Sequence, residues 1–139
     1  KMQGIKIGEL KVGQTASFRK TISETDVYLF AGITGDTNPA HIDEIHAKQT
    51  KFGKRIAHGL LVSSFISTVL GTMLPGPGTI YVSQSVNFKA PVYIGDTIEA
   101  RVTVKELITE KNRVILTTDI LNQNNEVVLT GEAIVLAPK

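Results

Sequence analysis

The sequence predicts an α+β fold in which an antiparallel sheet curls around one long apolar helix. The period of the apolar residues is helical as far as Leu74 and becomes two from Thr79 onward. The stretch 60–74 is apolar nearly all round, which predicts a helix buried on every side. A sheet with one apolar face needs a cover, and this helix can provide it. At 139 residues, we expect residues 1–139 to form a single domain.

Two further helices are expected before the central one. Ser23 and Asp26 have the spacing of a capping box, and the helix that follows should end at Gly35. Asp43 can cap a second, shorter helix. The central helix should end before Pro75, because proline cannot continue it.

Strands are expected where every second residue is apolar. A short alternating segment around Ala16 and Phe18 precedes the helices, and four more segments follow the central helix. Turn signals at YIGD and NQNNE help to separate these four segments. Their alternating apolar residues are Ile80, Val82, Val86 and Phe88; Ile98, Ala100, Val102 and Val104; Val114, Leu116 and Ile120; and Val127, Leu129, Ala133 and Val135. Four strands with one apolar face each predict an antiparallel sheet.

Composition and charge exclude several classes of protein. The net charge is +2, from 15 basic and 13 acidic residues scattered along the chain, so the basic stripe of a nucleic-acid-binding protein is missing. A small anionic ligand remains possible. The absence of cysteine excludes disulfides and thiolate chemistry, and three histidines without zinc-site spacing predict no metal centre.

Neither a membrane span nor an export signal is expected. The central apolar run is shorter than the ~20 residues that cross a bilayer, and it contains five hydroxyl side chains, at Ser63, Ser64, Ser67, Thr68 and Thr72. The segment KMQGIKIGELKVGQ lacks the continuous apolar region of a signal peptide. We therefore expect a cytoplasmic protein that does not act at a membrane.

The stretch GITGDTNPAHID, Gly32 to Asp43, places two groups that can move protons close together. Asn38 precedes Pro39, which keeps Asn38 out of the helical region and forces a sharp turn between Asp36 and His41. One interpretation is structural, with Asp36 capping the turn and His41 capping the next helix. The other is that the two side chains act together on one substrate.

This region resembles the signature of the MaoC-like (R)-specific enoyl-CoA hydratases. The residues that carry the resemblance are FAGITGDTNPAHIDEIHA, and the similarity continues through AHGLLVSSFISTVLG and SQSVNFKAPVYIGD. One departure is Ala40, where the family has a larger aliphatic residue; it affects local packing more than chemistry. The resemblance implies a hot-dog fold, a homodimer, and reversible addition of water to a trans-2-enoyl thioester, giving the (R)-3-hydroxyacyl thioester. No cofactor is implied, because coenzyme A is part of the substrate.

Hydration explains the two titratable groups. One water must lose a proton as it attacks the β-carbon, and the α-carbon must receive a proton, so two groups should face the same water. Asp36 and His41 fit this need, and desolvation by the apolar helix and sheet would favour a neutral aspartate. The sequence leaves open which residue takes the first proton. His46 is interpreted as a solvated helix residue.

The thioester oxygen gains negative charge during hydration and needs a hydrogen-bond donor. His58 and Gly59 stand where the central helix begins, and free amides and the positive end of the helix dipole lie there. We expect the Gly59 amide to be this donor, as the resemblance also implies. The alternative is that Gly59 merely permits a tight turn. His58 is interpreted as structural or supporting.

Further residues are expected around the site. Asn38 and Ser67 should support it, although a serine in a helix can instead bond a carbonyl of the preceding turn. The residues expected to bind substrate are Tyr81, Ser83, Gln84 and Lys89, the first three across a dimer interface; ordinary positions at a sheet edge are the alternative. A basic surface for an acyl carrier protein, or for the phosphates of coenzyme A, could be formed by Lys48, Lys51, Lys54, Arg55 and Lys89.

Other functions of the same fold remain open. A dehydratase acting on acyl carrier protein would use the same residues in the reverse direction. A hot-dog thioesterase would need a lone carboxylate, and the presence of His41 beside Asp36 argues against it. A non-catalytic acyl-binding domain would be expected to lack one of the pair. Acyl chain length depends on the depth of the pocket.

Overall fold

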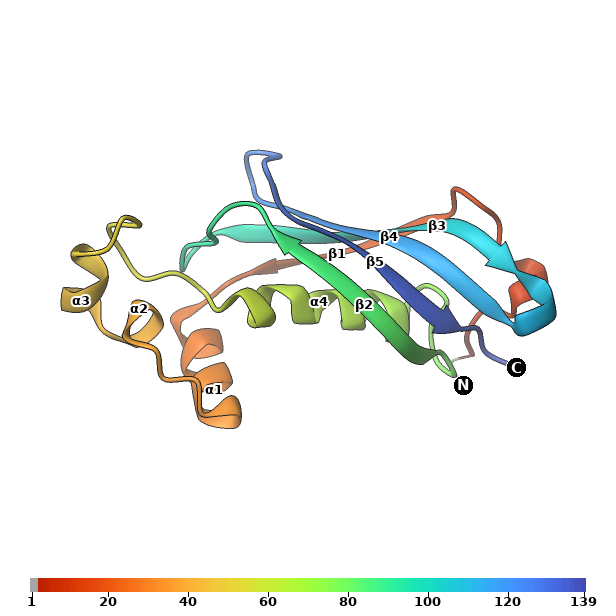
Figure 1. The fold of residues 1–139 in the computed structure, drawn as a ribbon, viewed down its shortest axis with the longest axis horizontal. Helices are drawn as coiled ribbons and strands as arrows, with labels where there is room; N and C mark the ends of the chain where they lie inside the picture. The colour runs from red at the N-terminus through yellow and green to blue at the C-terminus, as the bar shows by residue number, and fades with distance from the viewer. Residues whose placement is uncertain (1–2) are drawn as a thin grey trace.

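A curved antiparallel sheet lies along helix α4, Gly59–Thr72, and the shorter helices gather at one end (Figure 1). The structure, a computed structural model, describes residues 3–139. The strands are β1 Thr15–Thr21, β2 Ile80–Phe88, β3 Thr97–Ile108, β4 Arg113–Leu121 and β5 Val127–Leu136. The remaining elements are α1 Glu24–Thr34, α2 Pro39–Ile42, α3 Glu44–Lys48 and the 3₁₀ turns Ile7–Glu9 and Thr109–Lys111. The predicted α+β class is confirmed.

The strand order is β1-β3-β4-β5-β2, with every pair antiparallel. β3, β4 and β5 are neighbours in sequence and in space, as short turns predict. β2 precedes β3 in the chain but crosses to the far edge and pairs with β5, for example Val86 with Gly131. Among residues 3–139, nothing pairs with the outer edge of β2. β2 is therefore an edge strand.

Local hydrogen bonds fix the ends of α1 as predicted. The Ser23 hydroxyl accepts the Asp26 amide at 3.1 Å, and the Asp26 carboxylate accepts the Ser23 amide at 2.9 Å. The helix ends at Gly35, whose φ of 79° lies in the left-handed region that glycine adopts without strain. Val27 and Ala31 are buried, so α1 is anchored to the core by one face.

The sharp turn after α1 contains a helix that periodicity did not reveal. α2 is four residues long, with Pro39 at its start and Asn38 as its N-cap. The Asn38 side-chain oxygen accepts the Ala40 amide at 3.0 Å. Asp43 then caps α3 as expected, accepting the Ile45 amide at 3.0 Å. A single turn is too short to show a helical period, which is why α2 was not predicted.

Helix α4 covers the sheet, but the prediction that it is buried on every side was wrong. Its buried side chains are Leu61, Val62, Ile66, Val69 and Leu70. Leu60 is 66 % exposed, and Ser64 and Ser67 are also exposed. Apolar composition did not reveal this, because the sheet packs against one side of the helix and leaves the other uncovered.

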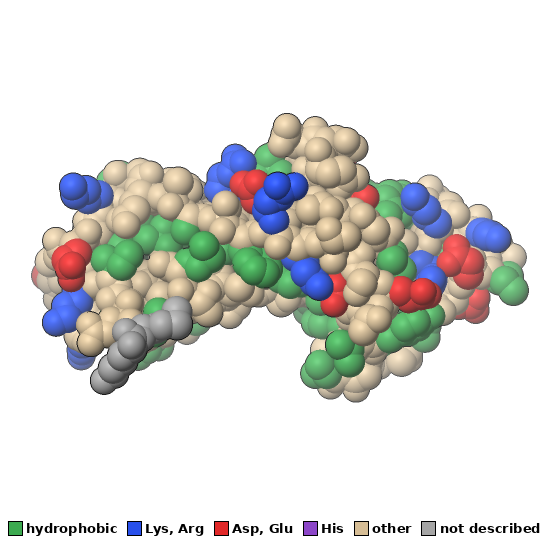
Figure 2. Space-filling view, turned by 180° about the vertical axis from the view of Figure 1, so that it is seen from behind, with side chains coloured by type: hydrophobic (Ala, Val, Ile, Leu, Met, Phe, Trp, Pro, Cys, Tyr) green, Lys and Arg blue, Asp and Glu red, His purple; other side chains and the backbone are tan. Residues whose placement is uncertain are grey.

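The surface carries charges of both signs. On the face shown in Figure 2, lysine and arginine side chains are interspersed with aspartate and glutamate, as a scattered distribution along the sequence predicts. No helix in residues 3–139 is long and apolar enough to cross a membrane.

Candidate active site

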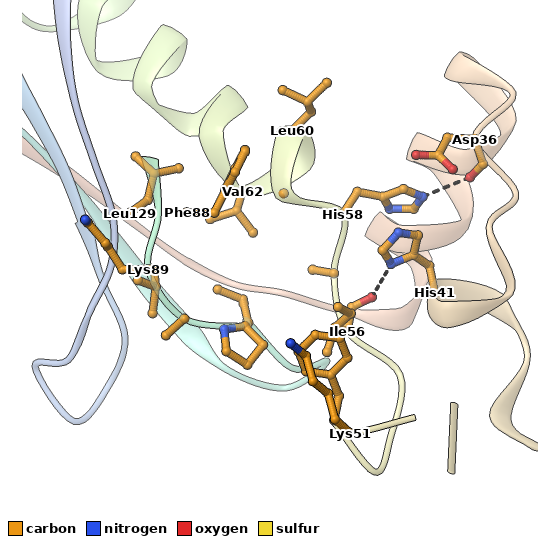
Figure 3. A pocket seen from close by; sticks show the side chains of 17 residues that line it. Asp36, His41, Lys51, Ile56, His58, Leu60, Val62, Phe88, Lys89 and Leu129 are labelled. Atoms are coloured by element: carbon orange, nitrogen blue, oxygen red, sulfur yellow. Dashed lines mark hydrogen bonds between the residues drawn. The ribbon is translucent and has the colours of Figure 1, made fainter. Parts of the chain in front are cut away.

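A cavity of about 550 Å³ lies beside the start of α4. Figure 3 shows its two walls: one carries Asp36, His41 and His58, and the other carries Phe88 and Leu129. The first wall comes from the α1–α2 turn and the segment leading into α4, and the second comes from β2 and β5. The structure thus places titratable groups opposite an apolar surface.

Asp36 lies on the turn between α1 and α2. Its carboxylate accepts the Asn38 amide at 3.2 Å, and its own amide donates to the Thr34 hydroxyl at 3.1 Å. The residue is exposed, so residues 3–139 do not provide the desolvation that was expected around it. Asp36 does stabilise its turn, as the structural interpretation holds, and it also lines the cavity.

His41 lies on α2 and is 8 % exposed. Its Nδ1 is 2.7 Å from the Ile56 carbonyl oxygen. Because a carbonyl only accepts, Nδ1 carries the hydrogen, and Nε2 of the neutral ring is a free acceptor. Burial lowers the pKa of His41 below 6.5, and the neighbouring His58 lowers it further, whereas the Ile56 carbonyl and Asp36 act in the opposite direction. His41 does not cap α3, since Asp43 does.

His58 joins this wall, although the sequence suggested only a structural or supporting role. Its ring is stacked on that of His41, with centroids 3.9 Å apart and planes 29° apart. Its Nε2 donates to the Asp36 carbonyl oxygen at 3.0 Å (Figure 3). The sequence signal was weak, because the two histidines are far apart along the chain and only the fold stacks them.

Asp36, His41 and His58 offer three potential ligand atoms within 4.8 Å of one another. The spacing of the three histidines predicted no metal centre, yet the fold brings two of them together with Asp36. The cluster nevertheless fits a metal poorly. Ring lone pairs lie in the ring planes, so two stacked rings do not direct their free nitrogens at one ion, and the free nitrogen of His58, Nδ1, is buried. The arrangement suits proton transfer better.

Gly59 is the first residue of α4, where amides have no partner within the helix. A Cβ at this position would lie 2.7 Å from Cε1 of Phe88, so the close approach of the ring requires glycine. Gly59 also lines the cavity. This contact with Phe88, rather than the tight turn considered from the sequence, accounts for a glycine here, and Gly59 lies beside a space in which a ligand could bind.

Four predicted site residues lie elsewhere in the chain. Ser67, Tyr81, Ser83 and Gln84 line a second hollow of about 360 Å³ between the exposed face of α4 and β2. The Tyr81 hydroxyl donates to the Gln84 side chain, which in turn donates to the buried Thr118 hydroxyl at 2.8 Å. Burial raises the pKa of Tyr81. Within one chain, these residues do not join Asp36 and His41.

The expected basic surface is smaller than predicted. Lys51 and Lys89 line the first cavity and are exposed. Arg55 instead forms ion pairs with Glu24 and Glu44, and its Nε lies 2.8 Å from Oε2 of Glu44. Lys51 and Lys89 are therefore the lysines placed to meet an anion at this cavity.

A curved antiparallel sheet wrapped on one helix, with titratable groups at the start of that helix, defines a hot-dog enzyme. Residues 9–125 match the MaoC like domain, and the chain belongs to this family. It is 57 % identical over 130 residues to the (R)-specific enoyl-CoA hydratase of Rhodospirillum rubrum, covering 94 % of this chain and 90 % of that one. It is 53 % identical to the 3-hydroxybutyryl-CoA dehydratase of Methylorubrum extorquens, and the match covers 94 % of this chain and 83 % of that one. The structure of the unliganded R-hydratase PhaJ1 of Pseudomonas aeruginosa superimposes with a TM-score of 0.93 at 44 % identity. The match covers 98 % of this chain and 87 % of that one.

Proposed function

We propose that this protein is an (R)-specific enoyl-CoA hydratase, which adds water reversibly to a trans-2-enoyl-CoA and gives the (R)-3-hydroxyacyl-CoA. The observation that carries the proposal is the placement of Asp36 and His41 in one cavity at the start of α4. The hydratase and dehydratase relatives described above, both named for CoA thioesters, support it.

Each part of the cavity has a task in this reaction. The His41 Nε2 and the Asp36 carboxylate are the two acceptors for a water molecule. One of them takes a proton as the water oxygen bonds to the β-carbon, and the pair returns a proton to the α-carbon. The Gly59 amide faces the thioester oxygen while negative charge develops on it. No separate cofactor takes part.

The thioester carrier is expected to meet the mouth of the cavity. Lys51 and Lys89 are the cations there, and coenzyme A carries phosphates that they can bind. An acyl carrier protein, which is acidic, is the second possible carrier. The names of the two relatives favour coenzyme A.

A homodimer and a cytoplasmic location belong to the same proposal. Pairing of two β2 edges would bring a second copy against the hollow that contains Ser67, Tyr81, Ser83 and Gln84. In this arrangement Tyr81, Ser83 and Gln84 bind the thioester across the interface, and Ser67 and Asn38 support the site. A cytoplasmic enzyme would meet acyl-CoA thioesters directly.

The test is hydration of crotonyl-CoA, followed as loss of absorbance at the enoyl band, with chiral analysis of the product. We expect the signal to fall and the product to be the (R)-enantiomer. A parallel thiol assay should show no free coenzyme A, because release of thiol would indicate a thioesterase. Absence of turnover on short- and medium-chain enoyl-CoA thioesters would refute the proposal. The same assay with crotonyl-acyl carrier protein compares the carriers.

A further inference from the structure

His58 occupies the N-cap of α4 without capping it. Serine, threonine, aspartate and asparagine are preferred at this position because their side chains accept a helix amide. The His58 side chain makes no such bond, and its ring is 1 % exposed. Helix α4 therefore has no side-chain cap at His58. The His58 side chain instead contacts Asp36 and His41.

The first contact anchors the turn that carries Asp36. The other hydrogen bonds of residues 35–38 are local; for example, the Asp36 amide donates to Thr34, the Thr37 amide to Gly35, and the Asn38 amide to the Asp36 carboxylate. Within residues 3–139, the 3.0 Å bond from His58 Nε2 is the one hydrogen bond that ties residues 35–38 to a distant segment. Without it, this turn is held in place mainly through the ends of α1 and α2.

The second contact fixes the ring of His41. That ring is held at one edge by the Ile56 carbonyl and on its face by the stack with His58. Phe30 of α1 also contacts His58, with ring centroids 4.8 Å apart. His58 is covalently next to Gly59, so a single side chain connects the surroundings of Asp36, His41 and the free amide of α4.

The two ring nitrogens of His58 have different surroundings. Nε2 carries the hydrogen that is donated to the Asp36 carbonyl. Nδ1 is buried and has no hydrogen-bond partner among the described residues. A hydrogen on Nδ1 would be buried without an acceptor, which is costly. Nε2 is therefore the ring nitrogen that keeps the hydrogen, which maintains the bond to the Asp36 carbonyl.

We propose that His58 is a positioning residue, which holds Asp36, His41 and the Gly59 amide in the relative positions that hydration requires. The inference rests on the proposed function, because the reaction gives these three groups their common task. Displacement of a reacting group by about 1 Å can cost on the order of 10²-fold in rate. Loss of the anchor should therefore lower turnover while Asp36, His41 and the Gly59 amide are all retained.

The test distinguishes the effect of the His58 hydrogen bond from the effect of its stacked ring. His58→Phe keeps a ring for the stack but has no donor. His58→Gln places an amide donor at about the reach of Nε2, whereas His58→Asn is too short to reach the Asp36 carbonyl. Val102→Ala, a buried substitution on β3 away from the cavity, is the control for general destabilisation. Each variant is assayed for kcat and KM well below its melting temperature, and the Thr37 and Asn38 amides are followed by NMR hydrogen exchange.

We expect kcat to fall by about 10–10²-fold in His58→Phe and His58→Asn, with KM changed less than about threefold. In these two variants the Thr37 and Asn38 amides should exchange faster. His58→Gln should recover part of kcat and most of the protection, and Val102→Ala should leave both unchanged.

Equal kcat in His58→Gln and His58→Asn would overturn the proposal, even if His58→Phe does not fold. Unchanged exchange in His58→Asn would overturn it as well. Hydrogen exchange does not depend on turnover. If the wild-type protein fails to hydrate crotonyl-CoA, the proposed function fails, and the exchange experiment still decides whether His58 anchors the turn.

Discussion

Asp36 and His41 share a cavity but differ in their surroundings. His41 is buried and held by the Ile56 carbonyl, whereas Asp36 is exposed on a turn. Burial disfavours a charged ring at His41, so the ring is available as a neutral acceptor, whereas Asp36 is open to solvent. The pair therefore has the asymmetry that acid–base chemistry on one water requires.

Removing either member should stop most of the turnover. We expect Asp36→Asn and His41→Gln each to lower kcat by roughly 10²–10⁴-fold, the usual contribution of general acid–base catalysis. The double variant should cost little more than the worse single one, because both residues serve one water. Steady-state kinetics with crotonyl-CoA gives the comparison, and circular dichroism checks the fold. A single variant with near-wild-type turnover would exclude that residue from the mechanism.

The lowered pKa of His41 predicts a defined pH dependence. Burial, its largest cause, disfavours the charged ring, so the folded-state pKa lies below the 6.5 of the free side chain. The acid limb of kcat/KM should therefore lie below pH 6.5, since the ring stays a base to lower pH. An acid limb above pH 6.5 would contradict the burial argument.

The same shift affects stability. The unfolded chain binds a proton at His41 below pH 6.5, and the folded chain does so only at lower pH. Between the two pKa values the unfolded state holds more protons, so the free energy of unfolding should rise with pH in this window. The contribution of His41 to stability is lost as the pH falls through the window. Urea titrations across the window measure the slope. His41→Gln should flatten it.

Phe88 changes how the role of Gly59 must be tested. Gly59→Pro removes the amide hydrogen, and the extended backbone of His58 (φ −58°, ψ 135°) accepts a following proline. The proline ring would also meet Phe88, as any Cβ would. Gly59→Ala is therefore the matched control, since it adds the Cβ and keeps the amide.

We expect kcat of Gly59→Pro to be about 10²–10³-fold below that of Gly59→Ala, the typical contribution of one oxyanion donor. Affinity for an acyl-CoA product should differ little between the two variants, because the charge is complete only in the transition state. Isothermal titration with the product provides that comparison. Equal kcat in the two variants would show that Gly59 serves packing alone.

At the scale of elements, α4 and β2 share an uncovered surface. In the described part of the chain, residues 3–139, no strand pairs with the outer edge of β2, and Ile80, Tyr81 and Val82 are 59 %, 41 % and 45 % exposed. α4 presents Ser64 and Ser67 beside it. Edge strands of this kind pair readily with a second chain, and a two-fold axis would place two β2 strands side by side.

Val82→Lys tests this interface. If two β2 strands pair, two lysines would face one apolar contact, and the dimer dissociation constant should rise by about 10²-fold. Val12→Lys is the control, because Val12 is 65 % exposed and lies outside β2. Sedimentation at micromolar concentration gives the assembly state. A wild-type protein that is monomeric and fully active would contradict the predicted dimer.

For the molecule as a whole, the sequence predicted best what local chemistry determines. The capping box of Ser23, the glycine stop at Gly35 and the cap at Asp43 depend on neighbouring residues, and all three are present. The exposed face of α4 and the crossing of β2 to the far edge depend on packing between distant segments. Periodicity contains no information about either, which is why they were not predicted.

The candidate site was also predicted only in part. Asp36, His41, Gly59 and Lys89, predicted together, do line one cavity. Ser67 lies in another hollow, because it faces away from the sheet. The stack of His58 on His41 was missed, since nothing in the spacing of two histidines reveals that their rings touch.

The two walls of the cavity have a consequence for how this enzyme could diversify. The titratable wall and its supports, including Ile56 and His58, are encoded in one continuous stretch, residues 36–59. The apolar wall is encoded much later, around Phe88 and Leu129. Mutations in the later segments can reshape the space for an acyl chain while the catalytic stretch keeps its sequence. Selection can thus alter substrate preference through the later segments while the sequence that determines the chemistry is retained.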